Sequence, residues 1–277
     1  MSRHLQIFLC LLAAVALLGA PTTSRAKDEE QVLNKPPTAK DYADLGKLPD
    51  WSGMWIPVVS DQIKQMTTNP PPWTPKVAAQ VKQQTDDQEA GKPLGIFVDC
   101  LPEGMPSWML ISHNFMEVAF TPGKIFLLGD SDGNRLRRIY TDGRPHPDDP
   151  DLTFHGHSIG HWEGDTLVVD TVGIKPETWL AIGEAQGIPN NGDMHVVERI
   201  HLIDANTLAD ELTITAPKVL TKPWKTTRLF ERERRRDLDI VEGVCIEGSF
   251  RPEIDKNGNH VFVPAPRTPD GNRMNAQ

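Results

Sequence analysis

The sequence predicts an all-β protein, in which an antiparallel meander of short strands closes into a β-barrel with one surface helix ahead of it. From about residue 105 onward, short runs rich in β-branched and aromatic residues alternate with turn sequences, without a helical period. Successive runs lie close together in the sequence, which favours antiparallel pairing. Many short strands without intervening helices are typical of a sandwich or a closed barrel.

The N-terminal residues have the pattern of a secretory signal peptide. Arg3 and His4 precede an apolar run over residues 7–20, which is too short to span a bilayer as a helix. The small-x-small sequence at residues 24–26 is a cleavage signal, so residues 1–26 are predicted to be removed. The mature protein is then expected to be periplasmic or secreted, with no membrane association.

The charge of the chain argues against a polyanionic partner. The whole sequence carries a net charge of −9. Removal of residues 1–26 takes away Arg3 and Arg25 and no acidic residue, so the mature chain would carry −11. A nucleic-acid partner is not expected with this balance.

Two cysteines remain after the predicted cleavage. Cys100 and Cys245 are candidates for a disulfide bond in an oxidising compartment. Such a bond would constrain the unfolded chain by about 4–5 kcal/mol. The alternative is two separate buried thiols.

The mature chain is interpreted as one large domain with extended ends. Residues 27–50 are polar and contain proline, which predicts an extended arm, and residues 51–264 should form the single barrel domain. A threonine cap followed by proline predicts the surface helix at about residues 75–90. The polar residues 265–277 should be a disordered tail.

About nine strands are expected after this helix. Turn sequences join most neighbouring strands, and the loop at residues 175–193 contains a possible short helix at Trp179–Ile182 that could act as a lid. The expected strands cover residues 109–113, 116–120, 124–130, 135–142, 155–162, 166–174, 194–204, 208–216 and 224–232.

The start of the folded region resembles a lipocalin. Residues 51–55 read Trp-Ser-Gly-Met-Trp and contain the Gly-x-Trp signature found at the first strand of lipocalin-type barrels. In that family the tryptophan closes the base of the barrel, and an arginine from a late strand packs on it. The resemblance implies a lipocalin-like barrel in which Trp55 has this position and Arg228 or Arg232 supplies the cation.

A longer set of motifs resembles a family of exported bacterial proteins of unassigned role, abundant in organisms that degrade aromatic and terpenoid compounds. The resemblance implies export and carries no reaction with it. Members of that family often have Pro-His-Ser at the position where this chain has Pro189-Asn190-Asn191, so this chain lacks that histidine. The matching motifs lie at residues 100–106, 138–147, 156–160, 162–171 and 197–199.

The stretch HGHSIGHWEGDTLVVDT at residues 155–171 carries the most polar side chains within strand-like sequence. Strand alternation would place His155, His157 and His161 on one face. A two-residue Gly164-Asp165 loop suits a type II′ turn and pairs Glu163 with Thr166, His161 with Val168 and Ile159 with Asp170. Asp170 then lies on the histidine face.

Three interpretations of this face remain open. His155 and His157 could bind zinc as a His-x-His pair, with Asp170 or His195 as a further ligand. His157 and Asp170 could instead form an acid–base pair near neutrality, because burial raises a carboxylate pKa and a histidine neighbour lowers it. The third interpretation is a hydrogen-bonded network that only fixes strand register.

Further residues are assigned roles in the acid–base interpretation. Glu198 lies inside an apolar run and is a third catalytic candidate, expected to pair with Arg138 or near Arg199 if its role is structural. Binding of the substrate is assigned to side chains that can hold an oxyanion, a carbonyl or an aromatic ring. These are Arg138, Tyr140, Trp162, Trp179 and His195.

The predicted function is that of an exported, cofactor-free enzyme with general acid–base chemistry, of the isomerase or lyase (dehydratase) type. The expected substrate is a small hydrophobic or aromatic molecule, bound with His157 and Asp170 in one enclosed apolar chamber. No metal is required, and no nucleophile elbow, phosphate loop or dinucleotide fingerprint occurs. The alternatives are a non-catalytic periplasmic binding protein for a small hydrophobic ligand and a zinc-dependent hydrolase.

Overall fold

The computed structural model describes most of the chain from Leu33 onward. The chain divides into two compact units, residues 1–36 and 37–277, and residues 33–36 of the first carry no regular secondary structure. The described residues are 33–90, 101–111, 115–129, 135–183, 186–240, 250–254, 256 and 260–264.

Several predictions fall outside these residues. The signal peptide at residues 1–26, the tail at 265–277 and both cysteines of the expected disulfide, Cys100 and Cys245, are not among the described positions. They stay predictions.

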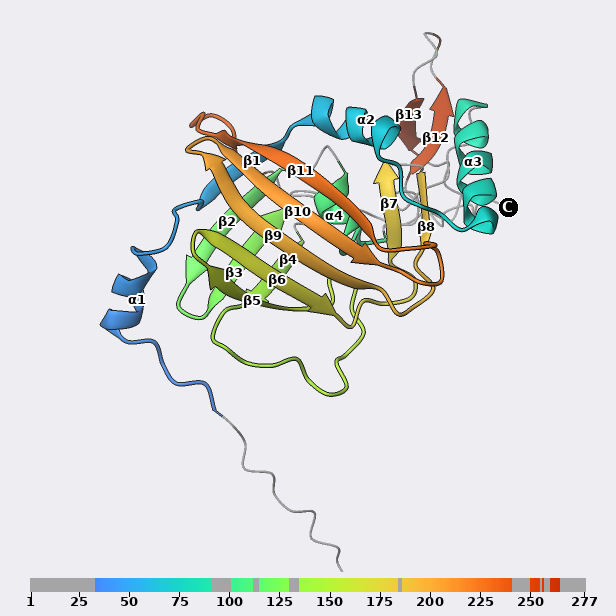
Figure 1. Cartoon of the computed structure of the whole chain (residues 1–277). Coiled ribbons are helices and arrows are strands. Elements are labelled where there is room, and N and C mark those ends of the chain that lie inside the picture. Colours follow the sequence, from blue (N-terminus) through green and yellow to red (C-terminus); the bar gives the residue numbers. More distant parts are fainter. Residues whose placement is uncertain are drawn as a thin grey trace, which may run out of the picture. The chain divides into compact units, whose positions relative to one another are not determined.

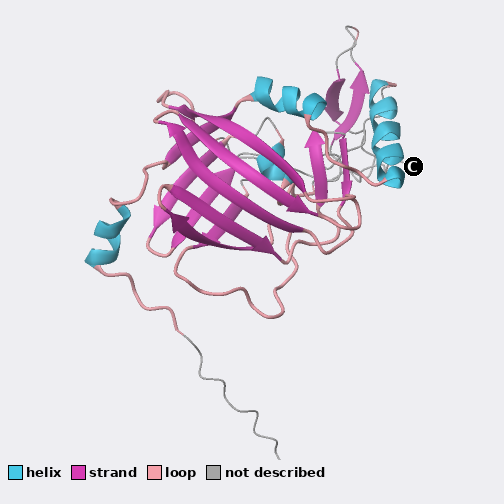
Figure 2. Cartoon of the chain, viewed as in Figure 1, coloured by secondary structure: helices cyan, strands magenta, loops and turns pink. Residues whose placement is uncertain are grey.

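A closed barrel of nine strands forms the centre of the second unit, which confirms the predicted fold class (Figures 1 and 2). Around the barrel the order is β1-β11-β10-β9-β6-β5-β4-β3-β2. The strands are β1 (Gly53–Pro57), β2 (Met116–Thr121), β3 (Lys124–Gly129), β4 (Leu136–Tyr140), β5 (His157–Glu163), β6 (Thr166–Val172), β9 (His195–Asp204), β10 (Thr207–Thr215) and β11 (Trp224–Glu233).

One pair of neighbouring strands departs from the antiparallel meander. β4 and β5 are parallel, with Ile139 opposite Ser158 and Tyr140 opposite Ile159. Parallel neighbours need a connection that returns the chain to the same end of the sheet. Residues 141–156 make this return, so the expectation of a purely antiparallel barrel is wrong at this point.

Two hairpins lie outside the barrel sheet, formed by β7 (Trp179–Gly183) with β8 (Gln186–Pro189) and by β12 (Phe250–Ile254) with β13 (His260–Pro264). The short helix expected around Trp179 is wrong, because these residues form β7. Leu180 pairs with Ile188 across the hairpin, and both side chains are buried.

The described residues contain four helices rather than one: α1 (Ala39–Leu45), α2 (Val59–Thr68), α3 (Pro75–Glu89) and α4 (Ser107–Leu110). α3 confirms the predicted helix. α1 interrupts the expected arm, where Thr38 and Asp41 form a capping box. The strand expected at 109–113 is wrong, since Met109 and Leu110 belong to α4.

Within the described part of the chain, none of the helices is long and apolar enough to cross a bilayer.

Trp55 and Arg232 pack against each other at one end of the barrel. Trp55 is fully buried and lies opposite Arg232 in the register of β1 and β11. The Arg232 guanidinium carbon lies 4.4 Å from the centre of the Trp55 ring. The same guanidinium donates hydrogen bonds to the carbonyl oxygens of Ser52, Asp50 and Ala205, so it joins three segments at this end.

α2, α4 and β7 are attached to residues at the opposite end of the barrel strands. Arg228 Nε donates to the Leu110 carbonyl of α4 at 3.3 Å, and Gln65 of α2 donates to the Thr227 carbonyl. Ser107 Oγ donates to the Trp179 carbonyl of β7 at 2.6 Å. Gly160 of β5 lies close to the Ile139 side chain of β4, since a Cβ added at Gly160 would lie 3.0 Å from it.

Candidate functional site

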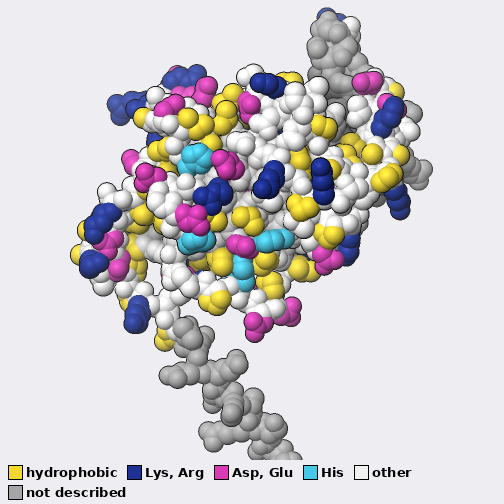
Figure 3. Space-filling view, in the orientation of Figure 1, with side chains coloured by type: hydrophobic (Ala, Val, Ile, Leu, Met, Phe, Trp, Pro, Cys, Tyr) yellow, Lys and Arg dark blue, Asp and Glu magenta, His cyan; other side chains and the backbone are white. Residues whose placement is uncertain are grey.

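A cluster of three histidines around one carboxylate lies on the outer face of the barrel. Asp170 comes from β6, His157 from β5, His195 from β9 and His146 from the 141–156 connection. The predicted hairpin register is confirmed, with Ile159 opposite Asp170. Figure 3 shows histidine side chains gathered on this face among acidic and basic side chains.

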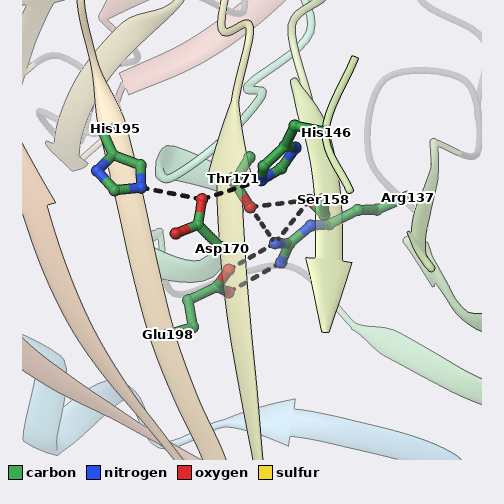
Figure 4. Close-up of polar contacts among 7 residues, drawn as sticks. All are labelled: Arg137, His146, Ser158, Asp170, Thr171, His195 and Glu198. Carbon is green, nitrogen blue, oxygen red and sulfur yellow. Dashed lines mark hydrogen bonds and ion pairs between the residues drawn. The ribbon is translucent and has the colours of Figure 1, made fainter. Parts of the chain in front are cut away.

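Asp170 accepts two hydrogen bonds on the same oxygen (Figure 4). His146 Nε2 lies 3.1 Å and His195 Nε2 lies 3.0 Å from Asp170 Oδ1. The second nitrogen of His146, Nδ1, lies 2.9 Å from Nδ1 of His157. His146 is therefore the central ring of a chain that runs from Asp170 to His157.

These contacts restrict where the protons can be. A carboxylate only accepts hydrogen bonds, so His146 donates from Nε2 to Asp170. A neutral His146 must then accept at Nδ1, which requires a proton on Nδ1 of His157 and leaves His157 Nε2 with a free lone pair. If the proton moves to His146, that ring becomes an imidazolium ion beside the Asp170 carboxylate.

Tyr140 and Arg144 complete the surroundings of His157. The Tyr140 ring stacks on the His157 ring at a centroid distance of 5.3 Å, and the Arg144 guanidinium carbon lies 4.1 Å from the Tyr140 ring centre. Burial, followed by the charges of His146 and Arg144, lowers the pKa of His157. His157 is therefore neutral at pH 7, which is the protonation state of a base.

The cluster is open to solvent, which corrects the expectation of an enclosed chamber. The side chains of Asp170 and His195 are 40% and 42% exposed, and that of His146 is 20% exposed. Along β6 the buried positions are Leu167, Val169 and Thr171, which point into the barrel. Asp170 alternates with them and must point outward.

The inner face of the same strands carries a separate polar network. Arg137 Nη1 donates to Glu198 Oε1 at 2.8 Å, and both of its Nη groups contact the Glu198 carboxylate. Arg137 Nη2 also donates to Ser158 Oγ and Thr171 Oγ1 (Figure 4). All four side chains are buried, so this network belongs to the core.

Glu198 therefore does not join the histidines, although it was a catalytic candidate. It is fully buried, and its partner is Arg137 rather than Arg138 or a neighbour of Arg199. Alternation explains the correction, because Arg137 points inward from β4 while Arg138 is exposed. Asp210 lies beside this pair, where burial and then the Glu198 charge raise its pKa well above the ordinary value.

His155 also separates from His157, which contradicts the His-x-His interpretation. Gly156 has a φ of 67°, and β5 begins only at His157, so the alternation does not extend back to His155. The His155 ring instead lies 5.2 Å from the ring of Trp108. Among the described residues, no group of three His, Cys, Asp or Glu side chains is arranged to hold a metal ion.

His155 should make the stability of the protein depend on pH. Burial and then the charges of Arg137 and Arg135 lower its pKa from 6.5 to about 4. Between pH 4 and pH 6.5, His155 of the unfolded chain binds a proton and His155 of the folded chain does not. The resulting contribution, about 3 kcal/mol, is fully present above pH 6.5 and is lost as the pH falls through 4.

Urea unfolding of the wild type and His155→Gln between pH 4 and 7 measures this effect. The variant should lose that part of the pH dependence, whereas the exposed control His161→Gln should keep it. Asp210 acts in the opposite direction above pH 3.8, because its raised pKa makes the folded chain bind the extra proton. Parallel curves for His155→Gln and the wild type would show that the assignment is wrong.

The remaining predicted site residues lie apart from the cluster. Trp162 points inward and lies 6.0 Å, ring centre to ring centre, from Trp51 in the core. Trp179 packs beside Ile111 and Ala181 near α4. Arg138 is exposed on the outer face of β4, without a contact to the cluster among the described residues. Of the predicted binding residues, the structure brings only Tyr140 and His195 to the cluster.

His146 is the residue that the sequence interpretation missed. It follows the Asp-Gly-Arg-Pro sequence at 142–145 and looks like an ordinary loop residue. No local sequence pattern places it at the cluster: the parallel pairing of β4 and β5, seen only in the structure, carries this loop past β5 and β6.

A groove of about 400 Å³ lies on the same outer face beside α2. Asp170, Val197, Thr213 and Lys225 lie opposite one another in β6, β9, β10 and β11. The groove therefore begins about 10 Å from Asp170, two strand spacings away. Its lining residues are Gln65, Asn69, Arg199, Glu211, Leu212, Thr213, Lys225, Thr226 and Thr227.

The fold and the site thus define an all-β barrel protein with a carboxylate-linked histidine cluster on its outer face. No protein-family model matches the chain, and a search of the curated proteins also gave no match.

Proposed function

We propose that this protein is an exported enzyme that moves protons on a small, largely hydrophobic molecule, with His157 as the general base. The observation that carries the proposal is the position of His146, whose two ring nitrogens contact His157 and Asp170. A histidine oriented by a second group, which is in turn held by a carboxylate, is an arrangement that suits general-base catalysis. The reaction types that fit are isomerisation and elimination or hydration.

The proposed step begins at the free Nε2 of His157. This nitrogen takes a proton from a carbon next to a carbonyl group, and the C–H electron pair forms the enolate. The Nδ1 proton of His157 then passes to Nδ1 of His146, whose positive charge is stabilised by Asp170. Return of the proton to another carbon completes an isomerisation, and its return to a leaving oxygen completes an elimination.

The outer face also offers an apolar surface for such a substrate. The side chains that surround Asp170 on this face are aliphatic and half-buried. They are Ile159, Val168, Val172 and Val197. Arg144 also lies near His157, where its guanidinium is paired with the Asp142 carboxylate.

Deuterium exchange tests the proposal without knowledge of the natural substrate. A panel of small cyclic and aromatic ketones is incubated with the protein in D₂O, and loss of the α-proton signal is followed by NMR. The wild type should accelerate exchange of at least one ketone, and His157→Gln should lower that rate by about 10²-fold or more. Because His157 has a lowered pKa, the rate should fall only below about pH 6.5.

His161→Gln is the matched control. His161 lies on the same strand, is exposed, and contacts Glu163 rather than Asp170. Its replacement should change the rate less than twofold. Ligand binding without exchange would favour the binding-protein alternative, and exchange that a chelator abolishes would favour a metal-dependent enzyme.

A further inference from the structure

The segment that leads into β9 has an unusual backbone conformation. Asn191, Gly192 and Asp193 have φ values of 63°, 102° and 60°, so the two residues that flank Gly192 adopt the left-handed region although each has a Cβ. Such a conformation costs free energy and persists only where neighbouring groups hold it. His195 of the cluster follows two residues later.

The side chain of Asn190 stabilises this backbone conformation. Its side chain is fully buried. Its Nδ2 donates to the carbonyl oxygens of Lys175 and Thr178 at 2.6 and 2.8 Å, and its Oδ1 accepts from the Gly192 N–H at 2.7 Å. The Asn190 N–H also donates to the Thr178 carbonyl at 2.9 Å. The bonds to Lys175 and Thr178 hold the 190–193 turn against residues 175–178, and the bond from Gly192 stabilises the turn itself.

Residues 173–178, to which Asn190 bonds, are also hydrogen-bonded to the 141–156 connection that carries His146. The Lys175 N–H donates to the Thr153 carbonyl at 2.9 Å, and the Thr153 N–H donates to the Gly173 carbonyl at 3.0 Å. The segment 173–178 is therefore bonded on one side to the His146 connection and on the other to the turn before His195.

We infer that Asn190 is a positioning residue for the histidine cluster, which sets the hydrogen bond between His195 and Asp170. The catalytic meaning of this role rests on the proposed function. The amide is the side chain that this position requires, because one planar group must donate twice to backbone carbonyls and accept once from a backbone N–H. An alanine removes the three side-chain bonds and leaves the turn held by two backbone bonds, from the N–H of residue 190 to the Thr178 carbonyl and from the Asn191 N–H to the Pro176 carbonyl.

The test follows the imidazole ¹⁵N signals of ¹⁵N-labelled protein. In the wild type, the ¹⁵N chemical shifts of His195, read through its ring C–H protons, should give the signal of an Nε2-protonated ring that donates to Asp170. Asn190→Ala should lose this signal and lower the ketone exchange rate by about 10-fold or more with little change in KM. The signals of His201, farther along β9, should not move, which shows that the barrel is intact.

Two further variants sharpen the comparison. Asn190→Asp has the same shape and keeps the acceptor for Gly192, but it cannot donate to both carbonyls, so it should also lose the His195 signal. Asn191→Gly is the matched control, because Asn191 is exposed, bonds only to the Pro189 carbonyl through its side chain, and has a φ that glycine adopts freely. It should retain both the signal and the rate.

The outcomes separate this inference from the proposed function. Loss of the His195 signal in both Asn190 variants supports the positioning role, even if the wild type exchanges no ketone and the proposed function fails. A His195 signal and an exchange rate that both survive in a folded Asn190→Ala or Asn190→Asp protein would overturn the inference.

Discussion

Replacing Asp170 by Asn should lower the rate of ketone deuterium exchange by about 10²–10⁴-fold while the barrel stays folded. The single carbonyl oxygen of an amide can still accept from both His146 and His195, but it is neutral and attracts their N–H groups less strongly than the carboxylate does. The positive charge that the relay places on His146 would also lose its counter-ion. The measurement is the exchange rate at saturating ketone, with far-UV circular dichroism to follow the fold.

Asp165→Asn provides the control for this variant. Asp165 belongs to the turn of the same β5–β6 hairpin and has no contact with the cluster among the described residues. Its rate should stay within twofold of the wild type. Equal rates for Asp170→Asn and the wild type would remove Asp170 from the mechanism and leave the cluster as a structural feature of the surface.

Replacing Arg137 by Met should lower the free energy of unfolding by about 3–5 kcal/mol at pH 7. The variant leaves the buried Glu198 carboxylate without its counter-ion and removes donors to Ser158 and Thr171. Asp210 cannot compensate, because it is a second buried carboxyl beside Glu198. Urea unfolding at pH 7 measures the loss.

The pH dependence of this loss identifies its cause. A buried carboxylate that has lost its counter-ion is the species that a lower pH relieves, so the deficit should be smaller at pH 4.5 than at pH 7. Arg199→Met breaks a surface ion pair with Glu163 instead and should cost no more than about 1 kcal/mol. A deficit that is the same at both pH values would mean that Arg137 acts through packing alone.

Local sequence rules predicted the hairpin correctly. The Gly164-Asp165 turn fixes the register because glycine takes a positive φ there, at 61°. Given the register, alternation alone places Asp170 on the face of His157. The Gly-x-Trp signature likewise led to the contact between Trp55 and Arg232, since both belong to the two strands that meet at the base.

The interior face was harder to predict, because both faces of these strands carry polar and apolar side chains. Ile159, Val168 and Val197 lie on the outer face and resemble core residues in the sequence. Arg137 and Glu198 lie inside, where their charges compensate each other. A period of two separates the faces of a strand, but it does not say which face is buried when a buried ion pair makes the inner face polar.

The sequence by itself determined the all-β class, the surface helix, the register of β5 with β6 and the common face of His157 and Asp170, since each depends on residues that are near in the chain. Only the tertiary structure decided that this face is the outer one and that His146 and Asn190 belong with it. Both depend on how the barrel closes: the parallel pairing of β4 and β5 sends the 141–156 connection past β6, and contacts between such distant segments have no local sequence signal.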